Sequence, residues 1–252
     1  MNLSCCLWAL ASDERDALSS LAEAGFQWID VRPFQIEASP SELRDHGMKV
    51  SCVAVSHGMP DDATMNTDDP DRSAKASAYI DRALEFGRSL GATCAYVVPD
   101  GGDSIAGGYA DSLADAAESA SQLDMRLCVE HFPGTALPTV AATLRFLSQV
   151  GAENLKLLYD TGHAQMSGES ADVIGTSSDE LGYVHLDDND GVEDLHLGLT
   201  DGVMTEWSLK ATFDSLSKVG YDGQVSLELN PNLDDPMGAL VRSRTLVKPL
   251  LT

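Results

Sequence analysis

Four side chains that could together bind a metal ion each stand at the end of an apolar run of this sequence: Glu130, Asp160, His185 and Glu228. No Lys or Arg stands in these run ends to neutralise the carboxylates, and a carboxylate removed from water without a partner is costly. A divalent cation would supply the missing charge. Three carboxylates and one imidazole form an oxygen-rich set of ligands, which suits Mn²⁺ or Mg²⁺ better than a structural zinc ion. We therefore expect one divalent metal ion, with Mn²⁺ as the first choice and Mg²⁺, Co²⁺ or Zn²⁺ as alternatives.

A structural role is the alternative for these carboxylates, which could cap neighbouring helices or accept hydrogen bonds from backbone amides. Asp187 and Asp188 fit a supporting role as well as they fit ligation. The distribution of histidine favours a shared site, because only His46 precedes an apolar run. The other five histidines stand at the ends of runs or in the segments that follow: His57, His131, His163, His185 and His196. Of these, we assign His57 to substrate binding.

Short apolar runs alternate with longer Ala- and Leu-rich stretches, and this alternation must position the polar residues. The eight runs expected to be strands are 3–10, 26–31, 49–55, 93–98, 126–129, 155–159, 182–186 and 224–229. The helix candidates are 14–24, 73–90, 109–123, 138–150, 207–219 and 237–250. Such alternation predicts a parallel sheet built from strand–helix–strand units. No linker divides the chain and no GxGxxG motif follows the first run, so we expect one α/β domain over 1–252, a (β/α)8 TIM barrel. Active sites of such barrels lie at the C-terminal ends of the strands, where the polar residues stand here.

The composition narrows the classes of partner. Forty acidic residues against sixteen Lys and Arg give a formal net charge of -24, which repels phosphate backbones and anionic lipids. We therefore expect neither a nucleic-acid nor a membrane partner. The five cysteines form no CxxC pair and lie in apolar runs, as buried free thiols do. The first residues lack the pattern of a secretion signal, so we expect a cytoplasmic protein, and a homo-oligomer is compatible with the sequence.

Several segments resemble the xylose isomerase-like TIM barrel superfamily, which includes sugar phosphate isomerases and epimerases. The matching pieces are VEHFPG at 129–134, LLYDTGHAQMSGE at 157–169, YVHLDDNDGVEDLHLGLTDG at 183–202 and GYDGQVSLELNP at 220–231. GFQWIDVRP at 25–33 is similar to the second strand of the family, with Asp30 at an acidic position. In ketose 3-epimerases and hydroxypyruvate isomerases, a Glu, an Asp, a His and a Glu hold the metal. The resemblance thus implies that Glu130, Asp160, His185 and Glu228 are the ligands.

The same resemblance implies roles around the metal. The two ligand glutamates form the proton-transfer pair of the family, so Glu130 and Glu228 are the expected catalytic residues. His163 matches a histidine that contacts the substrate. This sequence lacks the Arg that ketose 3-epimerases carry shortly after the metal-binding His, because residues 187–191 read DDNDG. We expect Asp194 and His196 to hold the substrate instead.

These residues support one common chemical step. One carboxylate can take a proton from the carbon beside a carbonyl, and a metal can stabilise the enediolate that develops. If a second carboxylate returns the proton, the result is isomerisation or epimerisation. Loss of a β-substituent from the same enediolate gives elimination, so a dehydratase or lyase acting on a keto-sugar or inosose is the main alternative. A non-catalytic sugar-binding barrel and an AP-endonuclease-like hydrolase are weaker alternatives, the latter because of the negative charge. The acidic segments after 182–186 and 224–229 predict an unphosphorylated, neutral keto-sugar or polyol as substrate.

Overall fold

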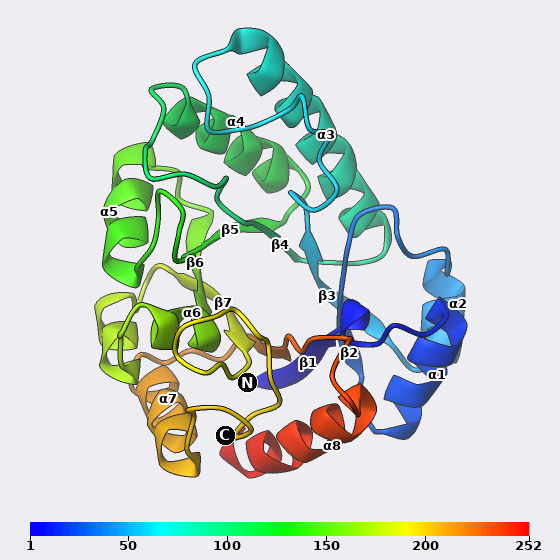
Figure 1. Ribbon diagram of the computed structural model, residues 1–252. Helices are drawn as coiled ribbons and strands as arrows, with labels where there is room; N and C mark the ends of the chain where they lie inside the picture. Colours follow the sequence, from blue (N-terminus) through cyan, green and yellow to red (C-terminus); the bar gives the residue numbers. More distant parts are fainter. Residues whose placement is uncertain (252) are drawn as a thin grey trace.

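Eight parallel strands close into a barrel in sequence order, with β8 paired to β1, in the computed structural model, which describes residues 1–251. The strands are β1 (Asn2–Cys6), β2 (Trp28–Val31), β3 (Lys49–Ala54), β4 (Cys94–Val97), β5 (Arg126–Glu130), β6 (Leu155–Asp160), β7 (Leu181–Leu186) and β8 (Gln224–Leu227). Figure 1 shows the helices arranged around this ring of strands. The TIM barrel predicted from the sequence is confirmed.

The helices that cover the barrel are α1 (Glu14–Glu23), α2 (Pro40–Asp45), α3 (Pro70–Ser89), α4 (Tyr109–Gln122), α5 (Val140–Val150), α6 (Thr161–Met166), α7 (Glu206–Lys218) and α8 (Pro236–Val247). All six predicted helices form. The sequence did not predict α2 and α6, because six residues are too few to show a helical period. Short 3-10 turns are η1 (Leu7–Ala9), η2 (Ala171–Thr176) and η3 (Lys248–Leu250). Within the described chain no helix has the length and apolar character needed to cross a membrane.

The first strand is shorter than the sequence predicted. Pairing with β8 ends at Cys5 and pairing with β2 ends at Cys6, and the following three residues turn into η1. Beyond Cys6 no neighbouring strand of the described chain offers backbone hydrogen bonds, so the chain is free to turn away from the sheet although its residues are apolar. The turn carries Trp8 over the end of the barrel, where its indole nitrogen donates a hydrogen bond to Glu228.

Side chains along each strand alternate between the barrel interior and the layer under the helices. On β5, Leu127 and Val129 belong to the large core between strands and helices. Cys128, between them, belongs to a small apolar cluster contributed by five neighbouring strands, which also contains Cys52, Ala54, Cys94, Tyr96, Leu158 and Tyr183. All five cysteines are buried free thiols, as predicted. The next interior position on β5 is Glu130, so the predicted metal ligands form a polar layer directly above this apolar layer.

Candidate active site

A cavity of about 530 Å³ opens at the C-terminal ends of the strands. Its wall combines residues from β3, β4 and β5 with residues that follow β2, β5, β6, β7 and β8. The polar side chains that line it are Arg32, Ser56, His57, Asp61, Tyr96, Asp100, Glu130, His163, Asp194, His196 and Glu228. Every residue that we assigned to catalysis or to substrate binding therefore lies at this one cavity.

The four predicted metal ligands come together, and two of them, Glu130 and Glu228, line the cavity. Each offers a ligand atom, and these atoms all lie within 4.8 Å of one another. Nδ1 of His185 lies at the centre of the group, 2.6 Å from Oε2 of Glu228, 3.4 Å from Oε1 of Glu130 and 3.9 Å from Oδ2 of Asp160. Glu130, Asp160 and His185 are buried and Glu228 is partly buried, and Asp160 and His185 have no exposed surface.

The unsatisfied atoms of this group fit a metal ion. Oε1 of Glu130, Oδ2 of Asp160 and Nδ1 of His185 are buried and have no hydrogen-bond partner in the described chain. Buried polar atoms are almost always paired in folded proteins, and three carboxylates would repel one another without a cation. Accordingly, burial raises the pKa of Asp160 well above its usual range, and the nearby charge of Asp187 adds to this effect. An oxygen-rich set with one imidazole can hold a divalent cation, which would remove this repulsion.

Asp30 supports this group from behind, a role that the sequence analysis did not assign. Its carboxylate is fully buried and lies 3.7 Å from Nε2 of His185, on the side of the ring away from the ligand group. The hydroxyls of Ser4 and Tyr183 donate hydrogen bonds to Oδ1 of Asp30, at 3.0 and 2.6 Å. A carboxylate on the far nitrogen of a metal-binding histidine fixes the ring and its tautomer. The sequence signal that could have indicated this role is an aspartate within an otherwise apolar strand.

His163 lies beside the ligand group in α6, which begins directly after Asp160. The carboxylate of Asp160 caps this helix by accepting a hydrogen bond from the backbone N–H of His163. Nδ1 of His163 lies 3.6 Å from Oε1 of Glu130, and Nε2 lies 3.6 Å from Oδ1 of Asp194. Burial by itself would lower the pKa of His163, but Asp160, Asp194 and Glu130 outweigh burial and raise it to about 10.

Asp194 and His196 form a second group with Asp187 on one side of the cavity. Nδ1 of His196 lies 3.0 Å from Asp187, and Nε2 lies 3.2 Å from Asp194. These two carboxylates outweigh the effect of burial and raise the pKa of His196 to about 12. His196 has a positive φ of 47°, a backbone conformation that is uncommon outside glycine and often marks a functional site.

The other two histidines of the set differ from each other. His57 lines the cavity from the β3 side, and burial followed by the charge of Arg32 lowers its pKa. His131 is completely buried and accepts a hydrogen bond from the backbone N–H of Asp160 through Nε2. Burial, and then the charge of His163, lower the pKa of His131 to about 3. His131 thus holds the chain at Asp160 as a neutral imidazole and does not face the cavity.

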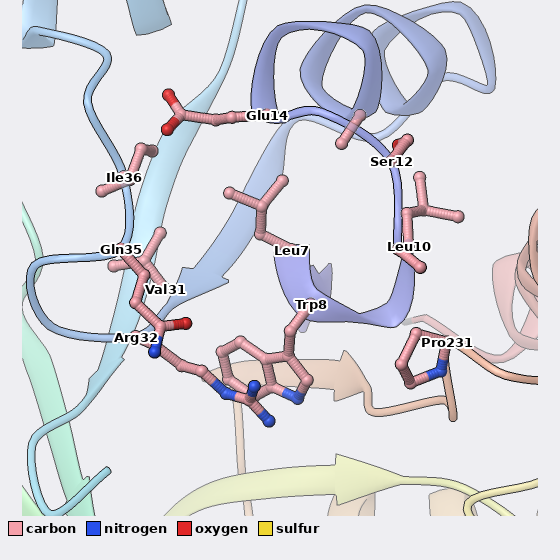
Figure 2. Close-up of a pocket in the computed structure, with 12 residues that line it drawn as sticks. Leu7, Trp8, Leu10, Ser12, Glu14, Val31, Arg32, Gln35, Ile36 and Pro231 are labelled. Carbon is pink, nitrogen blue, oxygen red and sulfur yellow. The ribbon is translucent and has the colours of Figure 1, made fainter. Parts of the chain in front are cut away.

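Two further residues next to the ligand group were not predicted: Arg32 lines the cavity, and Trp8 lines a neighbouring pocket. Trp8, from η1, donates a hydrogen bond of 3.2 Å from its indole nitrogen to Oε1 of Glu228. Arg32 follows β2 and places its guanidinium 4.7 Å from the ring centre of Trp8. Figure 2 shows both side chains at a neighbouring pocket, with the guanidinium beside the indole. The segment 25–33 contains Arg32 but does not indicate this contact, because the contact joins two segments that are distant in the sequence.

The chain belongs to the xylose isomerase-like TIM barrel family, whose sequence pattern matches residues 18–245. A protein of Streptomyces coelicolor, named as a proposed hydroxypyruvate isomerase, is 29% identical over 94% of this chain and 91% of its own length. L-ribulose 3-epimerase of Mesorhizobium japonicum is 26% identical over 88% of this chain and 78% of its own length. Inosose dehydratase of Serratia proteamaculans is 29% identical over 57% of this chain and 53% of its own length.

Solved structures agree with the fold. D-allulose 3-epimerase from a Methylomonas species superposes with a TM-score of 0.84 at 17% identity, covering 100% of this chain and 98% of that one. The IOLI protein, solved with a bound zinc atom, superposes with a TM-score of 0.83 at 16% identity, with the same coverage of both chains. At such low identity the likeness shows the barrel fold.

Proposed function

We propose that this protein is a divalent-metal-dependent isomerase or epimerase that acts on a small unphosphorylated keto-sugar or polyol. One observation carries the proposal: Glu130 and Glu228 reach a single ligand group from β5 and from the end of β8, with two strands, β6 and β7, between them around the barrel. The names of the Streptomyces and Mesorhizobium relatives support this class of reaction. A non-catalytic sugar-binding barrel would have no need for two glutamates on different sides of one ion.

The proposed site would hold the metal through Glu130, Asp160, His185 and Glu228, and the ion would stabilise negative charge on the carbonyl and hydroxyl oxygens of the substrate. One glutamate removes the proton from the carbon beside the carbonyl, and the pair of electrons left behind forms an enediolate. The other glutamate delivers a proton to the same carbon from the opposite face, which gives an epimer, or to the neighbouring carbon, which gives an isomer. His57, His163, Asp194 and His196 hold the hydroxyl groups of the substrate.

Supporting contacts prepare Glu228 for such a role. Trp8 donates to one of its oxygens and His185 lies 2.6 Å from the other. Burial would raise the pKa of Glu228, but the charge of His185 outweighs burial and lowers it to about 2. In the metal-free protein the carboxylate is therefore ionised, and its two contacts fix its direction.

Mn²⁺ is the ion that we propose, since three of the four ligands are carboxylates. The net charge of -24 supports a small-molecule substrate over nucleic acid, and we propose a cytoplasmic location. Elimination is the second candidate, and the similarity to the Serratia inosose dehydratase favours it. The two reactions share the first proton transfer, so product analysis separates them.

The test uses protein freed of metal with EDTA, reloaded with Mn²⁺, and assayed in D₂O with a panel of ketoses and inososes by NMR. We expect deuterium to enter the carbon beside the carbonyl, with an isomer or epimer as product. Glu130→Gln and Glu228→Gln should each reduce turnover by about 10²-fold or more at full Mn²⁺ occupancy, because an amide can bind metal but cannot accept the proton. Glu153→Gln, an exposed glutamate outside the cavity, is the matched control. Near-normal rates in both cavity mutants at full occupancy would contradict the proposal.

A further inference from the structure

Arg32 is the only Lys or Arg among the described residues that line the cavity. It comes two positions after Asp30, whose side chain points into the barrel, so the alternation of β2 directs the side chain of Arg32 to the cavity as well. The other charged residues of the wall are acidic or histidine. A single guanidinium in this cavity of a chain with net charge -24 needs a reason.

The protein itself does not provide an anionic partner for Arg32. No carboxylate of residues 1–251 forms an ion pair with its guanidinium, although other arginines of the chain have such partners, including Arg242 with Asp201 at 3.1 Å. No side-chain hydrogen bond of Arg32 is present in the same part of the chain either. The donors of Arg32 therefore remain free for a ligand.

Arg32 is nevertheless held in place. Its guanidinium lies 4.7 Å from the ring centre of Trp8, a cation–π contact that restrains the planar group. Figure 2 shows the two side chains together beside a second pocket of about 340 Å³, whose wall includes Leu7, Val31 and Ile36. That apolar wall suits the aliphatic part of an arginine. Because Trp8 also donates to Glu228, one indole ring separates the guanidinium from the proposed reaction centre.

We propose that Arg32 binds a carboxylate of the substrate, and that the substrate is a small hydroxylated 2-oxo acid in preference to a neutral ketose. The inference rests on the metal-dependent proton transfer of the proposed function and replaces the neutral substrate proposed there by an acid. The fork of a guanidinium matches a carboxylate through two parallel hydrogen bonds. A carboxylate entering this acidic cavity would be repelled without a cation, and Arg32 supplies one. The expectation of a neutral substrate considered only the acidic segments after β7 and β8, which do not include Arg32.

A carboxylate fits this position better than a phosphate. Asp61, Asp100 and Asp194 line the same cavity, so a second negative charge on the ligand would meet further repulsion. Hydroxypyruvate shows what the reaction requires: one proton leaves C3 and one enters C2, and the hydroxyl proton moves from the C3 oxygen to the C2 oxygen. The C2 carbonyl becomes a hydroxyl and the C3 hydroxyl becomes an aldehyde, while the carboxylate at C1 stays unchanged on Arg32.

Three compounds of three carbons test the inference with the Mn²⁺-loaded enzyme. Hydroxypyruvate carries a carboxylate, dihydroxyacetone carries a hydroxymethyl group in its place, and dihydroxyacetone phosphate carries a phosphate. We expect the wild type to have the highest kcat/KM for hydroxypyruvate. Arg32→Gln should raise KM for hydroxypyruvate about 10- to 100-fold, as expected for the loss of a charge-assisted pair. The rise in KM should be much smaller for dihydroxyacetone, because this compound has no carboxylate for Arg32 to bind. Arg32→Lys, which keeps the charge without the fork, should lie between the two.

A binding measurement separates this inference from the proposed function. Calorimetry with glycerate and glycerol, which differ by a carboxylate, does not require turnover. We expect Arg32→Gln to lose glycerate binding, whereas Arg15→Gln, the same charge change outside the cavity, should retain it. Equal glycerate affinity in wild type and Arg32→Gln, or a wild-type preference for dihydroxyacetone or its phosphate, would overturn the inference and leave the isomerase proposal intact. Loss of glycerate binding in Arg32→Gln without turnover of any compound would support the inference and contradict the isomerase proposal.

Discussion

Two layers of side chains fill the interior of the barrel, and they differ in kind although the same strands supply both. The lower, apolar layer contains Cys128, Leu158 and Tyr183. Two residues further along the same three strands stand members of the upper, polar layer, which are Glu130, Asp160 and His185. Both layers are almost completely buried. The two layers thus share their burial and their strand geometry, and they differ only in the chemistry of their side chains.

The difference lies in what each layer needs to be stable. The lower layer is stabilised by packing, and burial raises the pKa of the Cys52 and Cys128 thiols, which keeps them neutral. The upper layer contains buried atoms without hydrogen-bond partners. A folded chain that leaves such atoms unpaired loses stability. We therefore infer that the upper layer serves to bind a ligand, whereas the lower layer stabilises the fold.

Removal of metal should give the largest effect on this comparison. We expect EDTA to abolish activity and Mn²⁺ to restore it, with one ion bound per chain. At a thousandfold excess of metal over its Kd, binding stabilises the folded state by about 4 kcal/mol, which corresponds to about 10 °C in Tm for a chain of this size. Metal analysis and thermal unfolding of both forms measure this. A second bound ion would assign Asp187, Asp194 and His196 to metal binding, because their ligand atoms also lie within 4.8 Å of one another.

Neighbouring substitutions on β6 should separate the layers. Leu158→Ala leaves a cavity in the lower layer, so we expect a loss of about 2–5 kcal/mol with or without metal and an unchanged metal affinity per folded chain. Asp160→Asn should act in the opposite sense. It should raise Tm of the metal-free protein, because one of the repelling charges is removed, and weaken metal binding. Calorimetry of both forms tests the pair, and a lower Tm for metal-free Asp160→Asn would show that the upper layer is stable without its ion.

Replacing Asp30, which lies behind the polar layer, should weaken metal binding less than replacing one of the proposed ligands. We expect Asp30→Asn to weaken metal binding about 10- to 100-fold, because the ring of His185 loses its orienting carboxylate. Metal titration by calorimetry measures the change. His131→Gln is a useful comparison, since His131 is buried near Asp160 but does not line the cavity. A metal affinity that is unchanged in Asp30→Asn would remove Asp30 from the site.

The smallest expected effect is the pH dependence contributed by His196. Folding raises the pKa of His196 to about 12 from about 6.5 in an unfolded chain, so the folded protein binds this proton more tightly. The stabilisation is complete below pH of about 6.5 and is lost gradually as pH rises toward the folded pKa. In metal-free protein, the difference in Tm between wild type and His196→Gln should therefore be larger at pH 6 than at pH 9. A difference that grows with pH would contradict the ion pairs with Asp187 and Asp194.

The amino-acid sequence determined most of the architecture. Eight apolar runs alternated with helical stretches, and the repeated placement of polar residues at run ends located the end of the barrel where the cavity and the proposed site lie. These signals are local, because a strand and the residue after it are continuous in the chain. The histidines show the limit of such reasoning, since His131 stands at a run end like the others but holds a backbone N–H and does not face the cavity.

Only the tertiary structure decided which distant residues complete the site. The register of β2 places Asp30 behind His185, which lies on β7, five strands further along the chain. The turn of η1 brings Trp8 between Arg32 and Glu228. Neither arrangement leaves a local pattern, because each depends on the closure of the barrel, which pairs β8 with β1 and brings the two ends of the sequence together.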